Sequence, residues 1–422
     1  MEVQVLSRAL IFEKLPMLLS KSPTKDIAIS QRILTAISFL IILWYVWLCF
    51  TNFLTFRPLW NDERAVFQSV EGLKGAEFFT KELINGQTFP HLYLFLIRQY
   101  ALPFDFNLAA LRLPSYICML IGFFLWVKIA SYEMKDKKQY ATFLLSWCAS
   151  VPLIYYSQEL KQYSMDVMAC ALFVLFLYNQ ERLQQASNRV KLISSLILLP
   201  ALLLFSYTAY FLVLFPLYNL IVPLRKDKKL VMPILLYIAS FLICGLLSYF
   251  FDVRLRPVEI NTTTYGSHFI YFDSIGHFFD SFGRGINDLF SRWFAERPRI
   301  VRKIGWFFVA FGLIHFFVGF FKNFKKQGYI LKSIETIALV IFAESIILGA
   351  LKKYPFSVPR TSLFFAPIIL YMTVKGIVSV AKINVYLSRA IYALYVVFLA
   401  FIAVSLTRIT YAGPITFQPY LW

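Results

Sequence analysis

The uncharged run at 33–56 limits what this chain can fold into more than any other feature of its sequence. A helix needs about 20 apolar residues to cross the hydrocarbon core of a membrane, and this run is long enough. Similar stretches lie at 139–158, 230–251 and 304–321. Hydrophobic residues make up 59% of the chain and charged residues only 15%, which excludes an ordinary soluble domain. The sequence therefore predicts an all-α polytopic membrane protein.

Short basic clusters between the apolar stretches assign each loop to one side of the membrane. Cytoplasmic loops carry an excess of Lys and Arg. Clusters of this kind are Lys135/Lys137/Lys138, Arg182/Arg189/Lys191, Arg225/Lys226/Lys228/Lys229 and Lys322/Lys325/Lys326. Placing them in the cytoplasm predicts about eleven transmembrane helices and an external C-terminus. Topology then accounts for most of the net charge of +19, and nucleic acid is not an expected partner.

Four regions follow from this path through the membrane. Residues 1–32 form a cytoplasmic segment, in which 3–19 is either a helix on the membrane surface or a frayed tail. Residues 33–250 form a transmembrane core with the external loop 56–110, residues 251–303 a second external loop, and residues 304–422 a C-terminal bundle. The expected spans are 33–55, 112–130, 140–156, 164–180, a hairpin within 192–224 that turns near Ser206, 230–250, 304–321, 334–351, 360–376 and 387–407.

The five cysteines lie in these apolar spans, at Cys49, Cys118, Cys148, Cys170 and Cys244. Their spacing is not that of metal ligands, so we interpret them as small buried hydrophobic residues. No cofactor is expected to be required, and nothing in the sequence indicates a divalent metal, although one is compatible with it.

Two adjacent carboxylates, Asp62 and Glu63, lie at the outer end of the first span. Like charges near the hydrocarbon boundary repel each other and lose hydration, so such a pair has no general packing role. The residues from Arg64 onward look like the start of a helix along the membrane surface. We interpret the pair as the source of a catalytic base, placed where a lipid-borne substrate meets water.

Two further polar segments are predicted on the same side of the membrane. The segment 155–163 contains Glu159 and Lys161, and the segment 352–360 ends at Arg360. The structural alternatives are a solvated turn for Glu159 and Lys161, and a snorkelling span end for Arg360. Carboxylates together with cations at one boundary instead suit a reaction with a phosphate leaving group.

Glu344 and the loop 251–303 each leave two interpretations open. Glu344 lies within an apolar span, where a carboxyl group is either functional or part of a buried pair. The loop is basic for an external segment, and long loops follow the positive-inside rule weakly. Its arginines also suit an anion such as phosphate.

Four sequence elements resemble the motifs of one enzyme family. They are Leu59-Trp60-Asn61-Asp62-Glu63-Arg64-Ala65, Phe89-Pro90-His91-Leu92-Tyr93, Tyr156-Ser157-Gln158-Glu159-Leu160-Lys161-Gln162-Tyr163, and Pro359-Arg360 followed by Pro367. In this order they resemble the C-type glycosyltransferases, in the bacterial branch akin to lipid A aminoarabinose transferases and protein O-mannosyltransferases. The resemblance covers about 33–376. Lys161 stands where the family usually has Arg, and Phe89 where it usually has a basic residue.

The resemblance implies a C-type glycosyltransferase fold with amphipathic helices in the first external loop. It also implies transfer of a hexose or pentose from a polyprenyl-phosphate donor to a hydroxyl of a lipid, glycan or protein at the outer face, with inversion at the anomeric carbon. Asp62 would be the base, with Glu63 beside it. The donor phosphate would be bound by Lys161, Arg360, His91 and Tyr93, supported by Arg64, Glu159 and Tyr163. The expected location is a bacterial inner membrane, with the active site facing the periplasm or exterior.

Two other functions fit a polytopic membrane protein. A transporter or lipid flippase predicts pseudo-symmetric halves and broken helices around a polar site at the membrane midplane. The sequence shows no repeat, and its polar residues gather at one boundary instead. A non-enzymatic subunit of a glycan-assembly complex is the third interpretation, in which Phe89 and Lys161 mark a decayed site.

Overall fold

The computed structural model describes residues 25–184, 189–224, 228–256, 266–294, 299–326, 333–355, 358 and 360–412. Every regular element within these ranges is an α-helix or a 3₁₀ turn, which confirms the predicted all-α class. The predicted surface helix at 3–19, Pro359 and the C-terminal end of the chain lie outside the described residues.

The helices differ widely in length. The long ones are α2 (Lys25–Leu54), α5 (Leu108–Glu133), α8 (Tyr163–Leu183), α12 (Val231–Phe251), α15 (Arg299–Lys326) and α18 (Val385–Ala412). The shorter ones are α3 (Asn61–Gly72), α4 (His91–Ala101), α6 (Lys137–Cys148), α7 (Val151–Tyr155), α9 (Arg189–Ala201), α10 (Thr208–Leu212), α11 (Leu214–Leu224), α14 (Ile275–Ser291), α16 (Ile334–Ala350) and α17 (Ala366–Ser379).

Five helical segments of the described chain are long and apolar enough to cross a membrane. They are Ile29–Leu54, Leu108–Glu133, Lys228–Leu255, Arg299–Gly319 and Val385–Arg408, each at a span predicted from the sequence. α7 and α8 would add a sixth if this pair, bent by 114°, is one span. Helices of this length and composition are those of an α-helical membrane protein. The other predicted spans correspond to shorter helices, and the total of eleven stays a prediction.

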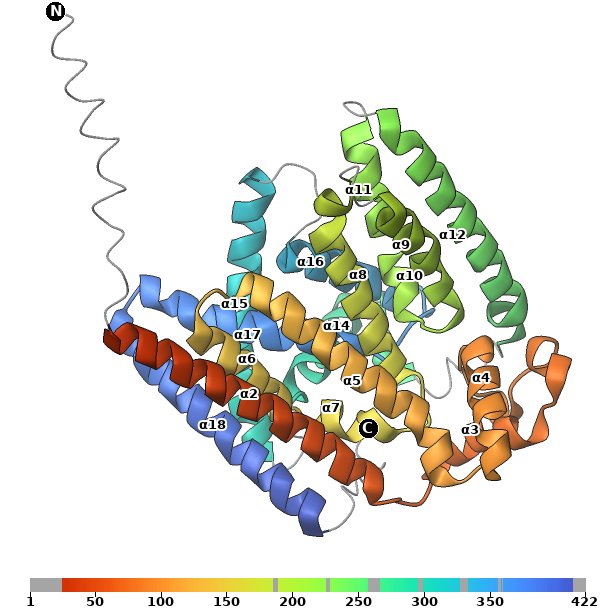
Figure 1. Cartoon of the computed structure of the whole chain (residues 1–422), viewed down its shortest axis with the longest axis horizontal. Coiled ribbons are helices and arrows are strands. Elements are labelled where there is room, and N and C mark those ends of the chain that lie inside the picture. The colour runs from red at the N-terminus through yellow and green to blue at the C-terminus, as the bar shows by residue number, and fades with distance from the viewer. Residues whose placement is uncertain are drawn as a thin grey trace, which may run out of the picture.

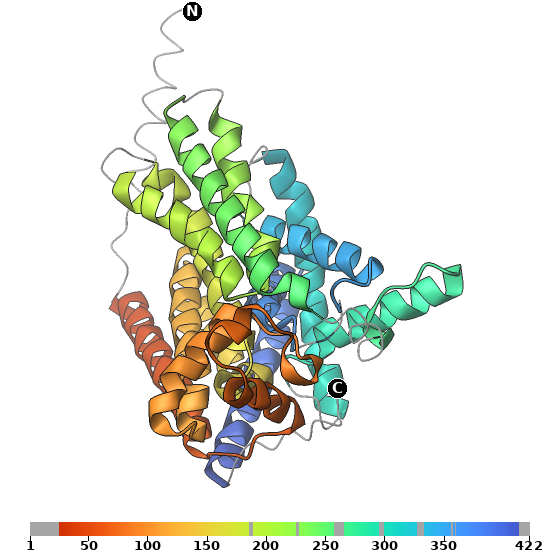
Figure 2. The same ribbon diagram turned by 90° about the vertical axis from the view of Figure 1, so that its right-hand side faces the viewer.

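The long helices pack side by side, and the segment 56–110, predicted as the first external loop, caps one end of the bundle. α2 and α18 are neighbours at the lower left of Figure 1, where Trp44 Nε1 donates to Thr407 Oγ1 at 2.9 Å. α12 lies on the opposite side with α9 and α11 (Figures 1 and 2). α3 and α4 lie together at the end where α2 finishes and α5 begins.

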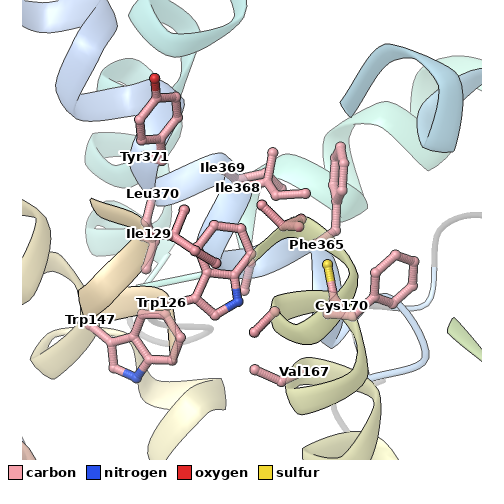
Figure 3. Close-up of a cluster of buried hydrophobic side chains, with 14 of the residues drawn as sticks. Trp126, Ile129, Trp147, Val167, Cys170, Phe365, Ile368, Ile369, Leu370 and Tyr371 are labelled. Carbon is pink, nitrogen blue, oxygen red and sulfur yellow. The ribbon is translucent and has the colours of Figure 1, made fainter. Parts of the chain in front are cut away.

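Large side chains fill the space where α5, α6, α8 and α17 meet. Trp126 of α5 and Trp147 of α6 are almost completely buried there, with Cys170 of α8 and Ile368 of α17 (Figure 3). The cysteine therefore lies among apolar side chains, as expected.

α15 and α17 approach each other closely through glycine. A Cβ atom added at Gly376 would lie only 2.1 Å from the carbonyl oxygen of Phe311, and one at Gly312 would lie 2.7 Å from the Thr373 nitrogen. Small residues allow helix backbones to approach in this way, which increases the dispersion contacts between neighbouring membrane helices.

The predicted span 140–156 is interrupted. α6 ends at Cys148 and α7 begins at Val151, with Pro152 in its first turn. A proline there loses no helical hydrogen bond but prevents the preceding helix from continuing. After the 3₁₀ turn Tyr156–Gln158, residues 159–162 are irregular and lead into α8. The break places residues 159–162, which are all buried, beside the predicted first external loop, where the Leu160 N–H donates to Glu63.

The predicted first external loop forms a small apolar core together with residues of α5 and α8. α3 buries Val66 and Val70, and α4 buries Leu94 and Ile97, so each helix turns one apolar face inward. The helix predicted to follow the Asp62-Glu63 pair is therefore present, and it starts at Asn61.

The segment 251–303, predicted as the second external loop, contains a strongly amphipathic helix, α14, that the sequence analysis did not predict. α14 extends sideways from the bundle in Figure 2, across the direction of the long helices. Phe278 and Phe282 pack on the main core, whereas Ile275 and Phe279 are exposed. An exposed apolar face of this kind suits the surface of a membrane.

Candidate functional site

Asp62 lies between two cations from distant segments of the chain. Its Oδ1 atom is 3.1 Å from Nζ of Lys161, in the irregular segment before α8. Its Oδ2 atom is 3.0 Å from Nη1 of Arg360, which follows α16 in the chain. The side chains of Lys161, Arg360 and Asp62 are 4%, 13% and 18% exposed, respectively. Three residues that the sequence predicted to share one side of the membrane thus meet at one point.

The two cations set the ionisation of Asp62. Burial disfavours its charged form, but the positive charges of Lys161 and Arg360 outweigh burial and hold the pKa of Asp62 below its ordinary value. The carboxylate is therefore ionised at neutral pH and can accept a proton. Its position in the first turn of α3 also favours a negative charge, because the helix dipole is positive there.

Glu63 is turned the other way and ties the loop to α5. Its Oε1 accepts from Nε of Arg112 at 3.1 Å and its Oε2 from Nη2 of the same residue at 2.8 Å. Arg57 Nη1 lies 3.2 Å from Oε2, and the Leu160 N–H donates to Oε1 at 2.9 Å. The Glu63 side chain is fully buried. Its contacts are those of a structural clamp, although the sequence suggested a catalytic role.

Arg57 and Arg112 complete this clamp and were not among the predicted site residues. Arg112 also donates from Nη1 to the Arg57 carbonyl at 2.6 Å, and the Arg57 guanidinium lies 4.5 Å from the centre of the Tyr155 ring. Arg112 stands at the first residue of the predicted span 112–130, and a charge in an apolar span is a functional signal in itself. That signal could have identified it.

Glu159 is a buried carboxyl group beside the same site. Trp60 Nε1 donates to its Oε1 at 2.7 Å, whereas its Oε2 has no hydrogen-bond partner in the described structure. Burial, followed by the negative charge of Glu63, raises the pKa of Glu159 from 4.5 to about 8. Glu159 is therefore protonated at neutral pH, unlike Asp62. A solvated turn is not what the structure shows here, since residues 155–163 are all buried.

Lys161 is held in place by more than the ion pair. Its Nζ donates to Gln87 Oε1 at 2.7 Å, and its carbonyl accepts from Ser115 Oγ at 3.1 Å. Gln158 and Gln162, in the same segment, are also buried and leave side-chain amide atoms without partners in the described structure. Buried polar atoms without partners are rare in proteins, and several of them lie here in the segment that carries Lys161.

His91 and Tyr93 are not brought to Asp62 by any contact in the described structure. His91 Nδ1 lies 2.5 Å from the Phe78 carbonyl, and burial lowers the pKa of this imidazole, so it is neutral at pH 7. The Tyr93 hydroxyl lies 3.8 Å from Cys118 Sγ, within the small core of the first loop. Both contacts lie away from Asp62, and the assignment of His91 and Tyr93 to the donor phosphate stays a prediction.

The remaining predicted residues have local roles. Arg64 is exposed, and its Nε donates to the Leu59 carbonyl at 2.8 Å. Tyr163 is buried with its ring 5.2 Å from that of Tyr156. Glu344 keeps one buried carboxyl oxygen without a hydrogen bond in the described structure, so the alternative of a buried pair has no support there.

Several arginines of the second external loop are already paired. Arg256, Arg284 and Arg292 each form an ion pair at 2.8 Å with the aspartate four residues earlier. The pair of Arg284 with Asp280 lies within α14, where this spacing stabilises a helix. This part of the basic excess therefore has local counter-charges, which reduces the need for an external anion.

Comparisons with known proteins identified no similar protein. No family model matches the chain, no curated protein matches it, and no solved structure matches it. Within the described residues, no three His, Cys, Asp or Glu side chains are grouped as metal ligands. A reaction without a required cofactor stays a prediction.

Proposed function

We propose that this chain is an integral membrane glycosyltransferase that moves a sugar from a polyprenyl-phosphate donor to a hydroxyl acceptor at the outer face. The main support is the contact of Asp62 with Lys161 and Arg360. It joins one carboxylate and two cations from three of the four family-like motifs. The C-type fold, the eleven spans and the outward orientation belong to the same proposal.

In the proposed reaction the acceptor oxygen attacks the anomeric carbon, and its proton passes to Asp62. The bond from this carbon to the phosphate oxygen breaks, and its electron pair leaves with polyprenyl phosphate. A carboxylate with a lowered pKa is a weak base, so the proton moves late and together with the attack. Charge develops on the leaving phosphate, where Lys161 and Arg360 stabilise it.

Buried side-chain atoms without hydrogen-bond partners, in the segment that carries Lys161, support a ligand site at this position. Gln158, Glu159 and Gln162 all come from the helix break and contribute donors or acceptors that the described structure leaves unused. A sugar carries several hydroxyl groups that can both donate and accept. Glu159, protonated at neutral pH, could donate to one of them and accept from another.

The set of proposed donor ligands is smaller than the sequence implied. Lys161 and Arg360 contact the base, whereas His91 and Tyr93 are occupied inside the first loop. We therefore assign the leaving phosphate to the two cations and treat His91, Tyr93 and Glu63 as positioning residues. Trp60 links both sides of this arrangement, since its ring centre lies 5.8 Å from the Arg360 guanidinium while its Nε1 donates to Glu159.

A lipid flippase is the second candidate, and the bend between α7 and α8 favours it. Transporters often use broken helices at their substrate sites. Here, however, the break is joined to the first external loop through Leu160 and Glu63. This places the polar groups at the end of the bundle, where a transferase would meet a water-borne acceptor.

The test uses the purified protein in lipid nanodiscs with undecaprenyl-phosphate-linked hexoses and pentoses and a panel of soluble alcohols. We expect release of undecaprenyl phosphate and a glycosylated alcohol in equal amounts. The same protein in sealed vesicles separates the two candidates. Movement of intact donor across the bilayer without release of undecaprenyl phosphate would favour the flippase and overturn the transferase.

A further inference from the structure

A groove runs between α2, α5 and α6 at the end of the bundle away from Asp62. It has a volume of about 370 Å³ and is lined by Ser38, Phe39, Ile42, Lys135, Lys137 and Tyr140, among others. A second groove of about 400 Å³ lies along the earlier turns of α2, and Lys138 is among its lining residues. In Figure 1 this is the left-hand end, where α2 begins and α5 finishes.

The lining of the groove changes along its length in the way that a phospholipid does. Lys135 and Lys137 lie at the junction of α5 and α6, which is the end of the bundle. Phe39 and Ile42 lie further along α2, toward its middle. Charged and hydroxyl groups at the mouth followed by apolar side chains match a polar headgroup followed by an acyl chain.

The charge at the mouth is positive overall, because three lysines flank a single carboxylate, that of Asp136, whose Oδ1 accepts from the Lys138 backbone N–H at 2.9 Å. Lys135, Lys137 and Lys138 are exposed, and no carboxylate in the described structure forms an ion pair with them. Glu133 is occupied by the Tyr178 and Tyr371 hydroxyls, at 2.5 and 2.9 Å. Two of the lysines also lie in the first turn of α6, where the helix dipole repels cations. A phosphate group would compensate both effects.

The groove belongs to the leaflet opposite the proposed active site. α5 begins at Leu108 beside the first external loop and ends at Glu133 beside the groove, a rise of roughly 39 Å over its 26 residues. This is more than the thickness of a hydrocarbon core, about 30 Å. The lysines are those that the positive-inside rule assigns to the cytoplasm, and the cytoplasmic leaflet carries the anionic lipids.

We infer that the groove between α2, α5 and α6 binds one anionic phospholipid of the cytoplasmic leaflet, with its phosphate at Lys135, Lys137 and Lys138 and an acyl chain along Phe39 and Ile42. This site is separate from the Asp62 site and does not depend on the proposed reaction. A lipid here would fill the space beside α2 and hold this helix against α5 and α6.

The test is native mass spectrometry of the full-length protein in detergent, titrated with dioleoyl phosphatidylglycerol and, separately, dioleoyl phosphatidylcholine. We expect one molecule of the anionic lipid to bind more tightly than the zwitterionic one. In the triple variant Lys135→Ala/Lys137→Ala/Lys138→Ala, the affinity for the anionic lipid should fall by at least about tenfold. Each lysine near the membrane surface attracts anionic headgroups, and the variant removes all three. Lys228→Ala/Lys229→Ala, in another exposed basic cluster, is the control and should bind normally.

A second variant separates the groove from general attraction between basic proteins and acidic lipids. Thr35→Trp fills the groove from the exposed surface of α2 and leaves every charge in place. We expect it to weaken binding as the triple variant does. Normal binding by Thr35→Trp, or equal losses in the control, would overturn the proposed site. Binding that appears only after removal of residues 1–24 would assign the groove to that segment and also overturn it.

Discussion

Asp62 and Glu63 are neighbours of the same chemical type, yet the fold gives them different surroundings. The helical turn points Asp62 toward Lys161 and Arg360 and points Glu63 toward Arg57 and Arg112. One carboxylate stays partly exposed and the other is fully buried. A substitution of Asp62 should therefore lower turnover, whereas a substitution of Glu63 should lower the stability of the fold.

Asp62→Asn keeps the size of the side chain and removes the base. We expect turnover to fall by about 10²–10⁴-fold. Donor binding should be kept or become tighter, because Lys161 and Arg360 no longer share their charge with a carboxylate. Transfer of radiolabelled sugar and equilibrium binding of the donor measure the two quantities. Near-normal turnover would exclude Asp62 as the base.

Glu63→Gln should instead damage the fold. It leaves two buried guanidinium groups without their counter-charge, a change that typically costs about 3–5 kcal/mol. We expect a lower apparent melting temperature in detergent at a fixed scan rate. Glu71→Gln, at an exposed position of the same helix, is the matched control. If the Glu63→Gln variant melts normally but has lost turnover, Glu63 has a catalytic role instead.

The cations at Asp62 should matter more for turnover than for donor affinity. The leaving phosphate gains charge in the transition state, and loss of one stabilising contact raises the barrier by about 2.7–4 kcal/mol. Lys161→Ala and Arg360→Ala test this, with exposed Lys228→Ala as the control. Lys161→Arg restores the usual residue of the resembling family and should keep or raise activity. If both alanine variants behave like the control, the phosphate site lies elsewhere.

Glu159 gives the folded protein a measurable pH dependence. Its pKa is raised from 4.5 to about 8 in the folded chain, so the folded state holds a proton that the unfolded chain releases. Stability from this group is complete below about pH 4.5 and is lost as the pH rises through 8. We expect the apparent melting temperature to decrease between pH 6 and 9. Glu159→Gln should flatten this slope, and an unchanged slope would contradict it.

At the scale of the helices, apolar length alone predicted the long spans. The run at 33–55 appears as a single helix because no proline or charge interrupts it. The run at 230–250 also forms one helix, because its single proline, Pro233, lies in the first turn of α12, where proline is tolerated. The predicted span 140–156 is not a single helix, because Pro152 lies in the first turn of a new helix. Hydropathy alone gives proline little weight, so the break was not predicted. α14 was missed because its apolar residues lie on one face, a pattern that a search for continuous apolar runs does not detect.

The contact of α15 with α17 predicts a position that tolerates no side chain. Gly376→Ala would place a methyl group 2.1 Å from a backbone oxygen, so one helix has to move. Overpacking of this kind typically costs about 1–3 kcal/mol. Gly245→Ala in α12, where a Cβ meets nothing within 4 Å, is the control. Equal melting temperatures for the two variants would show that the helices do not pack in this way.

At the scale of the whole molecule, the sequence placed Asp62, Lys161 and Arg360 on one side but could not show that they touch. Residues 62 and 360 are 298 positions apart in the chain, and their contact depends on how the intervening helices pack. The same limit applied to Glu63, whose partner Arg112 lies on α5. Basic clusters and chain order predict that these residues share one side of the membrane, while helix packing decides which carboxylate meets which cation.

Under the proposed reaction, the shared cations also impose an order on substrate addition. Without donor, Lys161 and Arg360 act as counter-ions of Asp62 and keep its basicity low. An incoming phosphate competes for the same two cations, so Asp62 becomes a stronger base only once the donor is bound. An acceptor, or a water molecule, that arrives first meets a carboxylate unable to activate it. The geometry thus favours a compulsory sequence, donor before acceptor, in which the donor itself switches on the base.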